Sequence, residues 1–285
     1  MTAHRLPLDP AVLHGHFSRE LEPVLTVEPG DSVTFATPNA GWSVGPDETV
    51  PRRDPERDTG HALAGPIEVR GARAGQVLSV RIDEVVPGPW GITLSEPPYE
   101  LHWTLADGIG RGAGRTVRLA PFLGVLGMPP AEPGIHSTIP PRRSGGNLDC
   151  KELVAGSTLY LPIPVDGALF SAGDGHAAQG DGEVSGTAIE APVEATVTLD
   201  VRDDLELEWP IARAGGAWLA FGCDQQLGAA ARIAVDGMLA LMAREHGLGR
   251  AEALALASVV ADLRVTQVVN EVLGVHAVLR DDAFA

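Results

Sequence analysis

Apolar and polar positions alternate in short runs between residues 20 and 210. Leu78, Val80 and Ile82 are separated by polar residues. The same period recurs in two further runs: Leu159, Leu161, Ile163 and Val165, and then Val197, Leu199 and Val201. Side chains of a β-strand point alternately to the two faces of a sheet, so a period of two is typical of a half-buried strand. Glycine turns at Pro29-Gly30, Ala74-Gly75 and Ala155-Gly156 come just before runs of this kind. We therefore predict mostly antiparallel sheet here, as a sandwich or barrel.

The pattern changes near residue 226. Apolar residues then recur at spacings of three and four: Leu227, Ala230, Ile233, Ala234, Met238, Leu241 and Met242. This spacing predicts a helix that ends at His246-Gly247, because glycine commonly terminates helices. A second helix is expected from Arg250 to Asp262 and a closing strand from Gly274 to Leu279. The fold class is therefore mainly β with an α+β C-terminal segment, and neither helix carries a convincing catalytic set.

Residues 84–150 are expected to form a long irregular loop, and long ordered loops in compact enzymes often build binding sites. A length of 285 residues allows one large domain or two modest ones. The division that we predict is an N-terminal β-rich region, residues 1–140, followed by residues 141–285, which combine β-hairpins with the two helices. The alternative is one compact unit.

The charge balance excludes some classes of partner. A formal net charge of −17 disfavours nucleic acid and anionic membrane surfaces, because like charges repel, but it permits a small neutral substrate. No stretch is apolar enough to span a membrane, and the first residues contain no secretory h-region. Two cysteines do not make a disulfide framework in a chain of this length. We therefore expect a cytoplasmic protein.

The segment from Ser171 to Glu190 carries the strongest candidate chemistry. Asp174, His176, Asp181 and Glu183 fall within ten residues. Asp174 and His176 would share one face of an extended strand, and an Asp181-Gly182 hairpin turn would fold Glu183 back towards them. Carboxylates and an imidazole on a glycine-lined backbone suit a divalent metal, and the histidine favours a transition metal over calcium. The alternative is a solvent-exposed hairpin with one incidental histidine. Glu190 is a poorer candidate, because a regular strand would turn it to the opposite face.

A second polar segment surrounds the turn at Gly145-Gly146-Asn147. Asp149 follows this turn and could reach a metal or simply cap the turn. Asn147 could donate its amide to an oxyanion, or play a turn role. Cys150, Lys151 and Glu152 are the residue types that thiol amidases use, but strand neighbours point to opposite faces, so we expect these three to diverge.

Several motifs resemble the acetamidase/formamidase family. The specific ones are Gly173-Asp-Gly-His-Ala-Ala-Gln-Gly-Asp-Gly-Glu183 and His136-Ser-Thr-Ile-Pro-Pro-Arg-Arg-Ser-Gly-Gly-Asn-Leu-Asp-Cys-Lys-Glu-Leu-Val154. Weaker matches lie at Gly65–Gly75 and Pro121–Pro130, and together they run in family order over most of the chain. The resemblance implies a homo-oligomer that hydrolyses a short aliphatic amide to carboxylate and ammonia with a bound metal.

The resemblance also implies roles for individual residues. Asp174 and His176, with Asp149 as third ligand, would hold a divalent metal, zinc first and calcium as the alternative. Glu183 would be the general base or a further ligand, and Asn147 a catalytic amide. The expected substrate-binding residues are His136, His61 and Trp103, although Trp103 could equally seal a core edge.

Two other functions stay open at this stage. One is a non-catalytic β-rich module that binds metal or carbohydrate, and the other is a thiol (Cys-Lys-Glu) amidase. The sequence does not distinguish formamide from acetamide, because one methyl group changes binding by only about 1–3 kcal/mol.

Overall fold

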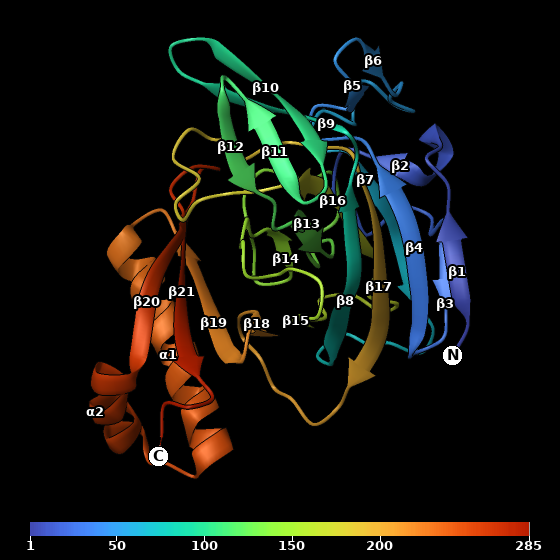
Figure 1. Ribbon diagram of the computed structural model, residues 1–285. Helices are drawn as coiled ribbons and strands as arrows, with labels where there is room; N and C mark the ends of the chain where they lie inside the picture. Colours follow the sequence, from blue (N-terminus) through green and yellow to red (C-terminus); the bar gives the residue numbers. More distant parts are fainter. Residues whose placement is uncertain (285) are drawn as a thin grey trace.

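The structure is a computed structural model that describes residues 1–284 (Figure 1). Strands make up most of the regular elements, with two helices near the C-terminus, as the sequence predicts. Two larger sheets form the body of the molecule, and smaller β elements flank them.

The largest sheet has nine strands in the order β1-β4-β17-β8-β15-β18-β19-β21-β20. Their bounds are β1 Ala3–Leu6, β4 Asp31–Thr37, β17 Val193–Arg202, β8 Val77–Pro87, β15 Thr158–Pro162, β18 Ile211–Ala214, β19 Ala217–Asp224, β21 Leu273–Arg280 and β20 Ala261–Gln267. The alternating runs are confirmed as strands in β8, β15 and β17, and Leu78, Val80, Ile82, Leu159, Leu161, Val197 and Leu199 are buried. The second run continues past the end of β15, and Val201 is half-buried. Because β8 pairs with both β15 and β17, the sheet joins strands from before and after residue 140.

The second large sheet has the order β14-β13-β16-β7-β2, and β3 pairs with β7 in parallel. The bounds are β14 Gly145–Asn147, β13 Phe122–Gly127, β16 Phe170–His176, β7 Leu63–Val69, β2 Leu13–His14 and β3 Leu25–Val27. Every residue of β13 and β16 is buried. One apolar cluster contains Phe35 and Val197 from the first sheet and Ile67, Leu123 and Phe170 from the second, so the two sheets pack face to face.

The expectation of an irregular loop over residues 84–150 is wrong. A four-stranded sheet lies in this region, in the order β12-β11-β10-β9 (Figure 1). Its strands are β9 Trp90–Ser95, β10 Tyr99–Ala106, β11 Ile109–Gly112 and β12 Arg115–Arg118. Leu101, Trp103 and Leu105 alternate with polar residues, and an Asp107-Gly108 turn with both φ values positive (53° and 72°) follows. The alternation and the Asp-Gly turn both indicate a hairpin, but the many prolines and glycines around them favour an irregular loop in a sequence-based prediction.

The helices are α1 (Leu227–His246) and α2 (Arg250–Val260), which confirms the predicted pair. Gly247 ends α1 in the left-handed conformation, and its N–H donates to the carbonyl of Ala243. The helix α1 packs on β19 and β21 (Figure 1). The strand β20 begins directly after α2 and was not predicted.

The remaining elements are short. They are a two-stranded ribbon of β5 (Ser43–Gly45) and β6 (Glu48–Thr49) and a 3₁₀ turn at Pro10–Val12. Within residues 1–284, neither helix combines the length and the apolar character that crossing a membrane requires.

Candidate metal centre

Five ionisable side chains meet beside the end of β16. His176 ends this strand, Asp174 lies two residues before it, and Asp149 follows β14. Glu183 and Glu190 come from the irregular segment after β16. All five are at most 6% exposed and line a cavity of about 430 Å³. We call Asp149, Asp174, His176, Glu183 and Glu190 the acid–imidazole cluster.

Three of these acids have an unusual backbone conformation. The φ angles of Asp149, Asp174 and Glu183 are +49°, +60° and +44°, in the left-handed region that residues other than glycine rarely adopt. Such strain concentrates at functional sites, where the surrounding structure maintains it. Asp174 and His176 both lie in β16 and meet, as their two-residue spacing predicted, although the backbone of Asp174 departs from regular strand conformation.

The ligand atoms form two sets that share His176. Its Nε2 atom lies 3.3 Å from Asp174 Oδ1 and 3.2 Å from Glu190 Oε1. Candidate ligand atoms of Asp174, His176 and Glu190 all lie within 4.8 Å of one another, and the same holds for Asp149, His176 and Glu183. Spacing of this kind allows a cation to contact several of these groups at once.

The cluster holds buried acceptor oxygens without donors. Among residues 1–284, no hydrogen-bond partner is found for Asp149 Oδ1, Asp174 Oδ1, Glu183 Oε2, Glu190 Oε2 or the neighbouring Asn147 Oδ1. Asp174 Oδ1 lies close to His176 Nε2 but does not form a hydrogen bond with it. Each buried polar group left unsatisfied costs about 1–3 kcal/mol, more when it is charged. A set made only of acceptors fits a cation, because a cation satisfies several oxygens together.

Burial and mutual repulsion perturb the acids. Burial, with the nearby Glu183 carboxylate, raises the pKa of Asp149 well above its usual range. Burial also raises the pKa of Glu183 to about 7, and that of Glu190 shifts upward for the same reason. Four carboxyl groups at this separation cannot all ionise without a compensating positive charge.

His176 and Asp174 shift in the opposite sense. Burial alone would lower the pKa of His176, but Glu190 and Asp174 raise it well above its usual value. Burial would likewise raise the pKa of Asp174, but His176 and His61 hold it below its usual range. Without a cation, the two therefore form an ion pair, and a metal at Nε2 would replace the imidazole proton.

Two amides from outside the cluster orient its ligands. Gln179 Nε2 donates to the carbonyl of Asp149 at 2.7 Å, so Gln179 Oε1 faces His176 Nδ1 at 2.9 Å. An amide oxygen only accepts, so Nδ1 must carry a proton, and Nε2 is the nitrogen that can bind a metal. Asn270 Nδ2 donates to Asp149 Oδ2 at 2.7 Å, which leaves Oδ1 free.

Gly124 in β13 provides the space for the cluster. A Cβ atom there would lie 2.6 Å from Asp149 Oδ1 and 3.0 Å from His176 Cε1, and would also meet Asp174 Oδ2. No side chain fits at this position without displacing at least one candidate ligand.

The other predicted residues divide into two groups. Asn147 and His61 line the cavity, and His61 Nδ1 lies 2.8 Å from Thr138 Oγ1. His136 and Trp103 lie outside it: His136 Nε2 contacts the carbonyl of Glu132 at 2.9 Å, and Trp103 lies in a small apolar cluster. Asp181 points away and pairs with Lys151 at 2.9 Å, so the Asp181-Gly182 turn brings in only Glu183.

Sequence reasoning missed several residues of the site. The low ranking of Glu190 assumed a regular strand after Glu183, but this segment is a loop, and Glu190 Oε1 lies 3.2 Å from His176 Nε2. Trp90 also lines the cavity, and its buried Nε1 has no acceptor in the described part of the chain. Gln179 lies inside the motif from Gly173 to Glu183. Asn270 is distant in sequence and belongs to none of the motifs that predicted the site.

A larger groove, about 880 Å³ in volume, lies elsewhere, beside Arg142, Pro164 and Leu207. Its described lining contains glutamates but no histidine or cysteine. Size alone therefore does not identify the functional site, and the chemistry of the lining favours the smaller cavity.

The fold and the cluster together define a mainly β protein with a buried centre suited to a divalent cation. The chain belongs to the Acetamidase/Formamidase family, whose sequence pattern matches residues 3–102 and 116–216.

Individual relatives agree with this assignment. The structure of acetamidase from Yersinia enterocolitica is 27% identical, with a TM-score of 0.90 over 99% of this chain and 93% of that one. The acetamidase structure from Bacillus halodurans is 28% identical, with a TM-score of 0.87 and 97% of each chain covered. A 48-residue segment is 50% identical to the acetamidase of Mycolicibacterium smegmatis, covering 17% of this chain and 12% of that one. The matches span 12% to 47% of the lengths of the curated relatives.

Gln179→Ala should weaken metal binding by about 10–100-fold, because His176 loses the acceptor that fixes its tautomer. Mn²⁺ titration followed by electron paramagnetic resonance measures this affinity. Gln226→Ala is the matched control, since this exposed side chain makes no capping hydrogen bond. Equal Mn²⁺ affinity in both variants would contradict the orienting role.

Gly124→Ala should lower Mn²⁺ affinity by a similar factor, about 10–100-fold, because its methyl group displaces Asp149 or Asp174. The apo protein should also lose about 1–3 kcal/mol of unfolding free energy from overpacking. Gly180→Ala is the control, because a Cβ atom there would meet nothing within 4 Å. Wild-type affinity in a folded Gly124→Ala variant would show that the cluster tolerates the methyl group.

Proposed function

We propose that this chain is a metal-dependent amidase that hydrolyses a short aliphatic amide, of the formamide or acetamide type, to carboxylate and ammonia. The observation that carries the proposal is the set of buried acceptor oxygens around His176, which lacks donors within residues 1–284. Family membership supports amide hydrolysis as the reaction. The cavity volume lies within the range of small-molecule sites, about 300–1,000 Å³.

The residues present fit a divalent cation. Asp149, Asp174 and His176 would hold it, with His176 as the ligand that the Asp149 set and the Asp174 set share. Glu190 belongs to the Asp174 set and lies in reach as a further ligand. Zinc is our first choice because an imidazole suits it, whereas the surplus of carboxylates makes calcium the alternative. Bound there, the cation would polarise the amide carbonyl and lower the pKa of water.

The chain's own residues would supply proton transfer and orientation. Glu183 is suited to take a proton from the attacking water and pass it to the departing nitrogen, as the C–O bond forms and the C–N bond breaks. Asn147 would donate its amide N–H to the developing oxyanion. His61 and the Trp90 N–H, which has no acceptor among residues 1–284, line the same cavity and would orient the substrate.

The thiol mechanism is less well supported. Cys150 is fully buried, and it is not among the described residues that line the cavity. Burial, with the Glu152 carboxylate beside it, raises the pKa of the thiol well above its usual value, which disfavours a nucleophilic thiolate. The expected divergence of the three residues is only half right. Cys150 and Glu152 meet at 3.3 Å because they lie in a turn, whereas Lys151 points to Asp181.

The proposal includes the remaining expectations from the sequence, a cytoplasmic location and a homo-oligomer. A non-catalytic module that binds metal or carbohydrate is the other candidate. It would bind metal through the same cluster but release no ammonia from an amide.

His176→Ala should abolish ammonia release from formamide and acetamide and remove most of the bound metal, because it deletes the ligand that both sets share. Ammonia assays and elemental analysis on the same preparation test this. His136→Ala is the control, since that histidine lies in the other recognised motif but outside the cavity. Full activity in a folded His176→Ala variant would overturn the assigned site.

Glu183→Gln keeps the size of the side chain but removes the proton acceptor. If Glu183 is the base, the rate should fall by about 10²–10⁴, roughly 3–5 kcal/mol, with metal content unchanged. A joint fall in rate and metal content would make Glu183 a ligand. An active variant with its full metal content would exclude both roles.

A further inference from the structure

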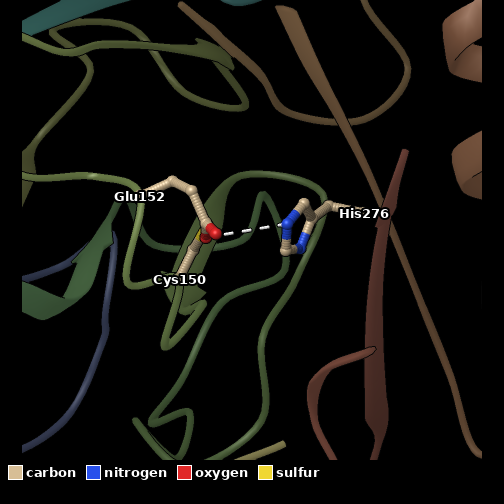
Figure 2. Close-up of side chains that lie close together, drawn as sticks. All are labelled: Cys150, Glu152 and His276. Atoms are coloured by element: carbon tan, nitrogen blue, oxygen red, sulfur yellow. Dashed lines mark hydrogen bonds and ion pairs between the residues drawn. The ribbon is translucent and has the colours of Figure 1, made fainter. Parts of the chain in front are cut away.

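A second cluster of potential ligands lies next to the first in the chain but outside its cavity. It consists of Cys150 and Glu152, from the turn after β14, and His276 from β21 (Figure 2). We call these three residues the thiol cluster. Cys150 Sγ lies 3.3 Å from Glu152 Oε2, and His276 Nε2 lies 3.6 Å from the same oxygen.

His276 directs an unpartnered nitrogen into this cluster. Its ring is fully buried, and Nδ1 is 2.8 Å from Thr266 Oγ1. Within the described residues, Nε2 has no hydrogen-bond partner, and 3.6 Å to Glu152 is too long for one. Burial lowers the pKa of His276, which favours the neutral ring. A neutral imidazole with a proton on Nδ1 presents the Nε2 lone pair to its neighbours.

We propose that the thiol cluster is a second metal site, built for Zn²⁺ or a similar borderline-soft divalent ion. Thiolate, imidazole and carboxylate are the three ligand types that zinc uses, at about 2.3, 2.0–2.1 and 2.0–2.2 Å. At tetrahedral angles these bond lengths separate sulfur from oxygen by about 3.6 Å and nitrogen from oxygen by about 3.4 Å. The separations present, 3.3 and 3.6 Å, match these values to within about 0.3 Å.

The surroundings leave the ligand atoms available. Arg264 pairs with Glu152 Oε1 at 2.6 Å, so Oε2 remains for the metal. Lys151 is neutralised by Asp181. On binding, the Cys150 thiol releases its proton to solvent as the sulfur–metal bond forms, and the thiolate and the carboxylate together balance the charge of the dication.

This site would be structural. None of its three ligands lines the 430 Å³ cavity within the described chain. A metal there would tie β21 to the turn that carries Asp149, one residue before Cys150. The inference rests on the geometry of these side chains and does not depend on the proposed amidase activity.

Cobalt distinguishes the two sites, because only the thiol cluster contains sulfur. Metal-free full-length protein titrated with Co²⁺ should develop a near-ultraviolet sulfur-to-cobalt charge-transfer band. Its final intensity should correspond to one sulfur-bound Co²⁺ per chain, whatever further Co²⁺ the acid–imidazole cluster takes up. The band should be absent in Cys150→Ser and retained in Cys223→Ser, which alters the other buried free cysteine. Added Zn²⁺ should remove the band by displacement.

A wild-type protein that reaches full Co²⁺ occupancy without this band would overturn the proposal, as would a band that depends on Cys223. If Cys150→Ser does not fold, Glu152→Gln replaces it, since this side chain is 20% exposed. Mutation of a residue that only orients a ligand typically weakens metal binding by about 10–100-fold. Loss of Glu152, a direct ligand, should therefore weaken Co²⁺ binding at the thiol cluster by at least this factor. Unchanged affinity in the folded Glu152→Gln variant would exclude the site.

Discussion

The structure depends on a concentration of buried acidic groups for which one imidazolium, that of His176, compensates only in part. Four carboxyl groups surround one imidazole, and an oxygen of each lacks a donor within residues 1–284. The local features of the site follow from this constraint. Left-handed backbone at Asp149, Asp174 and Glu183 brings the acids together, and the missing side chain at Gly124 leaves room for them. A chain under no functional constraint would relieve this repulsion and strain, which together oppose folding.

The rest of the fold supplies the rigidity that holds these groups in place. The strands β13 and β16 are buried along their whole length, which holds Asp174 and His176 in place. Gln179 and Asn270 then fix individual atoms by hydrogen bonds from two separate loops. The result is a preorganised cluster, in which ligand orientation is set before any ion binds.

The sequence predicts local structure better than it predicts the composition of the site. Periodicity identifies β8, β15, β17 and both helices, because an element that buries one face has apolar residues at its own structural period. Asp174, His176 and Glu183 could be grouped because they lie close together along the chain. Gly124, Gln179 and Asn270 could not, since their roles arise from strand pairing and loop packing over long distances. The low ranking of Glu190 came from extending strand geometry into a segment that forms a loop.

Lys151 is the only lysine in the chain, and its ammonium group is paired with Asp181 and about one third exposed. It follows two candidate ligands of different clusters, Asp149 and Cys150. Amine-directed chemistry therefore has one side-chain target in the whole chain, beside both clusters. Acylation would remove the positive charge and leave the Asp181 carboxylate without this partner, so a fluorophore attached through this amine would report on the surroundings of Asp181.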